Sequence, residues 1–303
     1  MIDYKKARKF GSLELLAKQV VEGFIAGLHK SPYHGFSVEF AEHRLYNSGE
    51  STKHLDWKLF ARTDKLFIKK YEEETNLRCH ILIDGSSSML FPVDEAYNKL
   101  SFSVDAAAAL IYLMRSQRDA FGVTFFSDDI DFFAPAKSSL PHQRFVFSHL
   151  EKLMLENFKE NHKKKTALSA MINRSALLLK KRSLVILFSD FMAIENFEEL
   201  NNAIKHLRYN KHEVVVFHIN HDGLENQFNL RNKYYNVVDM ETGEKMKLHP
   251  REIKEVYQRK RNEQLEQLNQ LLIQHQVDLI NVDIDRGFDD VLLQYLIKRK
   301  KIF

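Results

Sequence analysis

Three oxygen-bearing side chains at alternate positions follow a short apolar run early in the chain. Residues 81–88 read Ile-Leu-Ile-Asp-Gly-Ser-Ser-Ser, so Asp84 ends the run and the hydroxyls of Ser86 and Ser88 come next. Such a run is typical of a buried strand, and open α/β sheets bind ligands where these strands end. Oxygen ligands suit a hard cation such as Mg²⁺, which keeps several waters and takes few protein ligands. The pattern predicts one part of a metal site.

Two later positions could complete this site. Asp190 follows a second apolar run at residues 183–188, and Thr166 opens a helical segment after a polar stretch. Each has an ordinary alternative, since Thr166 could simply cap the helix and Asp190 could be a loop or capping residue. All three pieces nevertheless fall where strands of one parallel sheet would end at the same edge. We therefore expect one Mg²⁺ site, with Mn²⁺ as a possible substitute, formed by Asp84, Ser86, Ser88, Thr166 and Asp190.

The elements that would position these residues alternate between strand and helix from residue 77 onward. Near-continuous apolar strands separated by helices are typical of a mostly parallel sheet covered on both faces. The sequence therefore predicts an α/β fold with a doubly wound, mostly parallel sheet. Strands are expected at residues 78–84, 121–126, 183–188, 213–219 and 277–284, and helices at residues 99–118, 141–156, 166–180 and 250–276.

Two further parts are expected outside this alternation. Residues 1–76 should form a separate N-terminal region, with an amphipathic helix within residues 4–30 and a small β-containing subdomain rich in aromatic residues. Residues 77–303 should form the α/β domain. Within it, a turn at Thr242 and Gly243 predicts a hairpin that is inserted, together with the long helix, near residues 234–276.

Composition excludes several classes of protein. The 303 residues are 44% hydrophobic, which is enough for a large core, and 45 basic against 41 acidic residues leave a net charge of only +4, so no nucleic-acid partner is expected. The single Cys79 excludes an intramolecular disulfide and a cysteine-rich zinc site, and it fits a reducing compartment. No apolar run approaches the roughly 18 to 20 residues that span a bilayer. We expect a cytoplasmic protein with no membrane span.

The order of the candidate ligands resembles a known motif. Asp-x-Ser-x-Ser, then Thr, then Asp on an α/β sheet is similar to the metal-ion-dependent adhesion site of von Willebrand factor type A domains. The upstream block also resembles the bacterial family named domain of unknown function fifty-eight, although Glu50 stands where that family usually has Asp. The matching residues are Glu39-Phe40, Arg44-Leu45-Tyr46, Gly49-Glu50, Asp56-Trp57-Lys58 and Ala61-Arg62-Thr63.

The resemblance implies a von Willebrand factor type A-like domain that is not an enzyme. Its Mg²⁺ would accept an acidic side chain from a protein partner, and the protein would work with a MoxR-type AAA+ ATPase in remodelling or assembling clients. The alternative is a metal-dependent phosphohydrolase that uses Asp84. Against it, Ser86 stands where such an enzyme would have a second acid, and no convincing general base accompanies the motif.

Overall fold

The protein forms two compact units, one of residues 1–22 with 77–303 and the other of residues 23–76. A computed structural model describes residues 12–28, 43–45, 60–62, 66–69, 77–93, 97–159, 167–192, 194, 196–240 and 243–302. Thr166, and most of the upstream block that resembles a known family, lie outside these residues.

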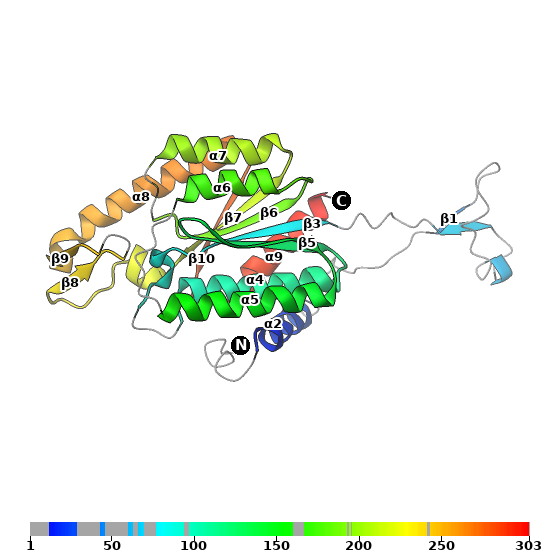
Figure 1. Cartoon of the computed structure of the whole chain (residues 1–303), viewed down its shortest axis with the longest axis horizontal. Coiled ribbons are helices and arrows are strands. Elements are labelled where there is room, and N and C mark those ends of the chain that lie inside the picture. The colour runs from blue at the N-terminus through cyan, green and yellow to red at the C-terminus, as the bar shows by residue number, and fades with distance from the viewer. Residues whose placement is uncertain are drawn as a thin grey trace. The chain divides into compact units, whose positions relative to one another are not determined.

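A six-stranded sheet forms the centre of the larger unit (Figure 1). The order of its strands is β10-β7-β6-β3-β4-β5, and all neighbours are parallel except β4 and β5. This arrangement confirms the predicted mixed α/β fold with a mostly parallel sheet. The strands are β3 (Arg78–Asp84), β4 (Ala120–Phe126), β5 (Ile130–Lys137), β6 (Leu184–Ser189), β7 (Glu213–Asn220) and β10 (Asp278–Asp283).

The central strands are apolar because helices cover both of their faces. Ile81, Leu82 and Ile83 in β3 are fully buried, and every residue of β6 is buried. A strand that is buried on both faces needs no alternation of polar and apolar residues. The antiparallel β5 lies at the edge of the sheet and is only partly buried, as expected for an edge strand with one free side.

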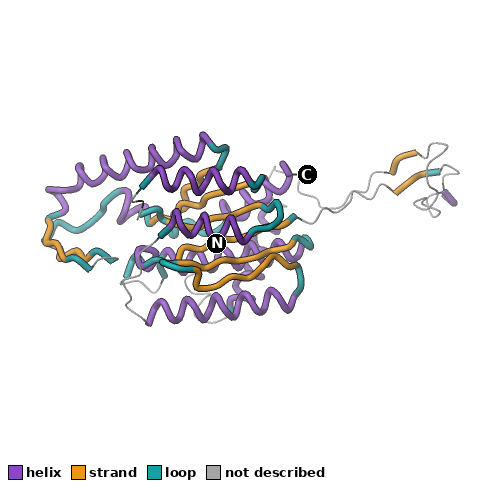
Figure 2. Tube along the Cα trace, turned by 45° about the horizontal axis from the view of Figure 1, so that its top comes forward, coloured by secondary structure: helices purple, strands orange, loops and turns teal. Residues whose placement is uncertain are grey.

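Two helical layers enclose the sheet (Figures 1 and 2). One face is covered by α6 (Leu168–Leu178), α7 (Phe197–Tyr209) and α8 (Pro250–Gln274), and the other by α4 (Lys99–Ser116), α5 (Leu140–Lys159) and α9 (Asp289–Ile302). The amphipathic helix α2 (Leu13–Leu28) adds buried side chains to this unit through its first half. The described helices include none that is both long enough and apolar enough to cross a membrane.

Among the described helices of the larger unit, α4 is the most deeply buried. Residues 106–109 are four consecutive alanines with no exposed surface, which lets the helix approach the sheet closely. Asn98 caps its start by accepting a hydrogen bond from the backbone amide of Ser101. The next residue, Lys99, is also buried. A cation in the first turn of a helix is unfavourable beside the positive end of the helix dipole, so Lys99 requires anionic partners.

The smaller elements agree with the sequence in kind and differ in detail. A hairpin of β8 (Tyr235–Val238) and β9 (Lys245–Leu248) precedes α8, as predicted, and Gly243 in its turn has a φ of 75°. Two short segments were not predicted, the 3₁₀ helix η2 (Ser87–Leu90) and the π-helix η3 (Asp222–Asn226).

In the second unit, the described residues contain one antiparallel pair of short strands. Strand β1 (His43–Leu45) pairs with β2 (Phe67–Lys69) in the register that places Arg44 opposite Ile68. This pair agrees with the expectation of a β-containing segment before residue 77.

Candidate metal centre

Parallel pairing of β3 with β6 brings two aspartates to the same edge of the sheet. Asp84 is the last residue of β3, and Asp190 directly follows the last residue of β6. Both are almost completely buried, with 1% of their surface exposed. Between them, Ser189 Oγ donates a hydrogen bond of 2.7 Å to Asp84 Oδ2. The two strand ends are thus connected through Ser189, the last residue of β6.

The turn after β3 presents the two predicted serine hydroxyls to this edge. The backbone amide of Ser86 donates to Asp84 Oδ1 over 3.0 Å, which fixes the start of the turn. Ser86 Oγ lies 3.1 Å from Ser88 Oγ, and Ser88 Oγ donates to Asp190 Oδ1 over 3.2 Å. The structure therefore brings together Asp84, Ser86, Ser88 and Asp190, and only Ser88 in this group is partly exposed.

A buried lysine lies on the other side of Asp190. Lys99 Nζ donates to Asp190 Oδ2 over 2.6 Å and to Glu225 Oε1 over 2.7 Å. The same ammonium lies 5.6 Å from the centre of the Phe91 ring. Glu225 comes from η3, and its second oxygen accepts a hydrogen bond from the backbone amide of His221. Lys99 therefore links the first turn of α4 to the loops that follow β6 and β7.

These contacts give the two aspartates different acidities. Burial and the neighbouring charge of Asp190 raise the pKa of Asp84 to about 6, although hydrogen bonds from Ser189 and Ser86 oppose the shift. Burial would also raise the pKa of Asp190, but the Lys99 ammonium outweighs it and holds this pKa below the ordinary value of 3.8. Burial disfavours the Lys99 ammonium, yet Asp190 and Glu225 together keep its pKa above 10.5. Asp190 and Lys99 are thus a buried ion pair.

Behind Asp190 lies a second buried cation. Arg261 of α8 is 5% exposed, and its Nη2 donates to the backbone oxygen of Asp190 over 3.3 Å and to His218 Nε2 over 2.9 Å. His218 Nδ1 lies 2.8 Å from Asn281 Oδ1, so the neutral tautomer with hydrogen on Nδ1 satisfies both contacts. Burial and Arg261 lower the pKa of His218 to about 4. At neutral pH, His218 is therefore uncharged.

The oxygen atoms present fit a magnesium ion in type and spacing. Oxygen ligands at adjacent corners of a magnesium octahedron lie about 3.0 Å apart, because each Mg–O bond is about 2.1 Å long. The separations of 3.1 Å between the two serine hydroxyls and 3.2 Å between Ser88 Oγ and Asp190 Oδ1 match this spacing. Both oxygens of Asp84 already accept hydrogen bonds, so Asp84 suits an indirect role through water.

The centre differs from sites made of histidine, cysteine and carboxylate ligands. Among the described residues, no group of three or more His, Cys, Asp or Glu side chains is placed to hold a metal ion. The candidate centre depends on serine hydroxyls together with one carboxylate oxygen. Whether Thr166 contributes a further hydroxyl stays a prediction, because it lies outside the described residues.

Sequence reasoning missed Lys99, Glu225, Ser189 and Arg261. One signal for Lys99 was available, since it opens a segment of almost entirely apolar and small residues, where a lone cation is unexpected. Glu225 gave no local signal, because it meets Lys99 from 126 positions away in the sequence. Arg261 lies in a helix rich in charged residues, so its burial could not be distinguished from the exposure of its neighbours.

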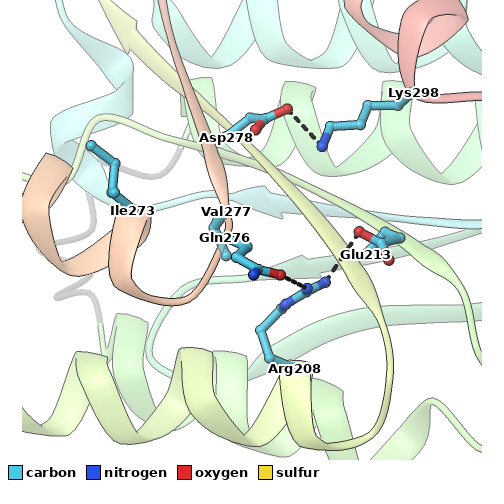
Figure 3. A pocket seen from close by; sticks show the side chains of 7 residues that line it. All are labelled: Arg208, Glu213, Ile273, Gln276, Val277, Asp278 and Lys298. Carbon is cyan, nitrogen blue, oxygen red and sulfur yellow. Dashed lines mark hydrogen bonds and ion pairs between the residues drawn. The ribbon is translucent and has the colours of Figure 1, made fainter. Parts of the chain in front are cut away.

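A pocket of about 410 Å³ lies at the opposite edge of the sheet, near the starts of β7 and β10 (Figure 3). Its charged side chains already interact with each other. Arg208 contacts Glu213 over 3.1 Å and Gln276 over 3.3 Å, and Lys298 contacts Asp278 over 2.7 Å. These pairs account for the charges in the pocket as structural contacts, so we place the candidate site at the carboxyl ends of β3 and β6.

Comparisons with known proteins agree with the upstream resemblance. Uncharacterised proteins from Mycobacterium bovis and Mycobacterium tuberculosis are each 24% identical to this chain over 217 residues. The aligned part makes up 72% of this chain and 66% of each mycobacterial protein, so the chain spans slightly less than two thirds of their length.

One solved structure similar to this protein is that of the conserved hypothetical protein BatB from Bacteroides thetaiotaomicron. The two are 15% identical with a TM-score of 0.49, and the alignment covers 74% of this chain and 98% of that chain. The profile of the family described as "Protein of unknown function DUF58" matches residues 42–267, which is well over half of the chain. The protein therefore belongs to the DUF58 family.

Proposed function

We propose that the protein is a non-enzymatic adaptor that binds a partner protein through a divalent metal ion, Mg²⁺ or Mn²⁺. One observation supports this above all others. The oxygens of Ser86, Ser88 and Asp190 lie in succession at separations of 3.1 and 3.2 Å, at the edge of the sheet where α/β proteins bind ligands. In this proposal the larger unit acts as a von Willebrand factor type A-like domain in the cytoplasm.

The residues of the chain would have distinct roles. Ser86 Oγ, Ser88 Oγ and Asp190 Oδ1 would hold the ion, with the hydroxyl of Thr166 as a further ligand. Asp84 would fix the turn through Ser86 and orient Ser189. When bound, the ion supplies an electrophilic centre with room for a ligand from outside, and a partner's Asp or Glu is the oxygen ligand that suits a hard cation.

The partner in this proposal is a protein that offers an acidic side chain, and we suggest a MoxR-type AAA+ ATPase as the machine with which the adaptor works. Among the described residues near the centre, we identify no general base with access to solvent. His218 is buried, and its ring nitrogens contact Arg261 and Asn281. A phosphohydrolase that uses Asp84 as nucleophile also has less support, because both carboxylate oxygens accept hydrogen bonds.

The test is metal-dependent capture of a MoxR-type ATPase by the purified protein. The double change Ser86→Ala and Ser88→Ala removes two proposed ligands, so we expect Mg²⁺-dependent capture to fall about tenfold or more while the fold persists. Chelation with EDTA should have the same effect on the unchanged protein. Capture that survives both treatments would exclude the metal as the contact.

A matched control removes two hydroxyls at the other edge of the sheet. Ser116 Oγ and Ser183 Oγ donate to the backbone oxygens of Leu113 and Lys181, so the double change Ser116→Ala and Ser183→Ala should leave capture unchanged. Incubation with p-nitrophenyl phosphate and Mg²⁺ tests the alternative. Turnover that disappears with Asp84→Ala would favour the phosphohydrolase over the adaptor.

A further inference from the structure

Lys99 fills the space beside Asp190 with a permanent positive charge. Its side chain is 1% exposed, and its ammonium contacts Asp190 Oδ2 and Glu225 Oε1 at 2.6 and 2.7 Å. Asp190 thus points one oxygen at the ammonium and the other, Oδ1, at Ser88. Lys99 and a metal ion bound to the serine hydroxyls would therefore share this single carboxylate group.

The buried charges around this edge can be counted. Asp84, Asp190 and Glu225 contribute three negative charges, whereas Lys99 and Arg261 contribute two positive charges. The described buried residues of the centre therefore have a net charge of −1. A divalent ion would leave the centre at +1, which is costly in a buried setting, and one added carboxylate would bring it to zero.

We propose that Lys99 determines the metal affinity of the candidate centre, and that it keeps this affinity low until a partner's carboxylate joins the ion. This inference rests on the proposed function, and it adds a reason for the partner to be acidic. The ammonium repels a divalent ion that binds on the other side of Asp190, so the ion and the acidic partner bind together more strongly than the ion binds alone.

The change Lys99→Met tests this charge balance directly. It keeps an unbranched side chain of similar length and removes the positive charge, so the centre would have a net charge of −2 that one divalent ion neutralises. We expect the variant to bind Mn²⁺ about tenfold or more tightly than the unchanged protein does. The measurement is a Mn²⁺ titration at pH 8 without any partner, followed by electron paramagnetic resonance of the free ion.

Thermal unfolding provides a second readout. In EDTA, Lys99→Met should melt at a lower temperature than the unchanged protein, because Asp190 and Glu225 lose their shared cation. Added Mn²⁺ should recover much of this loss. The matched control is Arg299→Met, which removes the cation that contacts the buried Asp119 at the opposite edge of the sheet. That variant should also melt earlier in EDTA, and Mn²⁺ should not recover it.

Glu225→Gln covers the case in which Lys99→Met does not fold even with Mn²⁺. It removes one negative charge while Lys99 and Asp190 remain, so the same argument expects Mn²⁺ affinity about tenfold weaker than in the unchanged protein. Affinity that is unchanged or tighter in Glu225→Gln would overturn the role of Lys99.

The outcomes for Lys99 and for the proposed function can be told apart. If the unchanged protein binds Mn²⁺ and Lys99→Met binds it no more tightly, the inference about Lys99 is wrong and the metal-dependent function stands. If only Lys99→Met binds Mn²⁺ without a partner, the inference stands, and the capture test with the partner present decides the metal-dependent function. If neither protein binds Mn²⁺, the inference about Lys99 is overturned, and the loss of capture in EDTA remains the test of the metal-dependent function.

Discussion

Two aspartates that end adjacent strands have opposite electrostatic settings. Asp190 has the Lys99 ammonium as a direct partner, whereas the hydrogen bonds that Asp84 accepts from Ser86 and Ser189 come from neutral groups. Burial therefore raises the pKa of Asp84 to about 6, while that of Asp190 falls below its ordinary value. At neutral pH without metal, the Asp84 carboxylate opposes folding, since its charged form is the one that burial disfavours.

Replacing Asp84 with Asn should remove this cost. A carboxyl with a folded pKa near 6 and an ordinary value of 3.8 holds its proton more tightly in the folded state, so it destabilises the fold as pH rises from about 4 through 6. In EDTA we expect the stability of Asp84→Asn relative to the unchanged protein to be about 2 kcal/mol greater at pH 7 than at pH 4. Urea unfolding at both pH values measures this difference.

Asp84→Asn must be compared with the unchanged protein at each pH, because buried histidines change stability with pH in the opposite direction. The pKa of His80 is lowered to about 3 by burial and His212, and the pKa of His218 to about 4, so both destabilise the fold as pH falls below 6.5. Their contribution is the same in both proteins and cancels in the difference. A difference that does not change between pH 4 and pH 7 would contradict the raised pKa of Asp84.

At the scale of single residues, the sequence predicted those site residues that stand in a local sequence pattern. Asp84, Ser86 and Ser88 lie within one strand-to-turn segment, and Asp190 ends a second apolar run, so their common edge followed from the parallel sheet alone. Lys99 and Glu225 could not be assigned, because a buried ion pair depends on which side chains meet after folding. Prediction thus found the oxygens that face the edge and missed the charges beneath them.

At the scale of elements, the turn from β3 into η2 packs closely against β4. The Gly85 amide donates to the backbone oxygen of Phe126 over 2.7 Å. A Cβ atom at position 85 would overlap the Phe125 ring and lie 3.2 Å from that same oxygen. Only glycine allows the serine-bearing turn to lie this close to the neighbouring strand, and this closeness directs Ser86 toward Asp84.

Gly85→Ala should therefore disturb both stability and the candidate centre. Overpacking of this kind typically costs about 1–3 kcal/mol, so we expect a loss of this size in urea unfolding together with weaker Mn²⁺ binding. Gly223→Ala in η3 is the matched control, because a Cβ there meets nothing closer than 3.6 Å. Equal stability losses in the two variants would contradict the packing argument.

Element types were predictable from the sequence, and several boundaries and short segments were not. The apolar runs identified five of the six strands, since helices on both faces require continuous apolar residues, and the partly buried edge strand β5 was not among them. The segments η2 and η3 are single turns at the ends of strands, too short for a periodic pattern. Contacts of Ser86 and Glu225 hold them in place.

At the scale of the whole molecule, the first half of α2 belongs to the larger unit although 54 residues of the second unit, residues 23–76, separate it from β3. The Leu13 amide at its start donates to Glu151 Oε1 of α5 over 2.8 Å. Leu16, Ala17 and Val20 on the same helix are buried. The amphipathic pattern predicted this helix, whereas its place against α5 is a tertiary contact with no signal in the sequence.

The contribution of α2 to stability can be measured with two neighbouring leucines. Leu16 is 3% exposed, so Leu16→Ala should cost about 2–4 kcal/mol in urea unfolding. Leu15 is 46% exposed, and Leu15→Ala should change stability by less than about 0.5 kcal/mol. A small effect of Leu16→Ala, similar to that of Leu15→Ala, would mean that α2 does not pack on the larger unit in solution.

The contacts of Asp119 have a consequence for synthesis on the ribosome. This fully buried carboxylate precedes β4 and accepts hydrogen bonds from the Leu77 amide, the Tyr295 hydroxyl and the Arg299 guanidinium. Arg299 follows Asp119 by 180 positions. While the chain is being translated, β3 and β4 leave the exit tunnel long before α9 does. The amino end of this central strand pair therefore stays hydrated until α9 has been made, because an unpaired carboxylate is costly to remove from water.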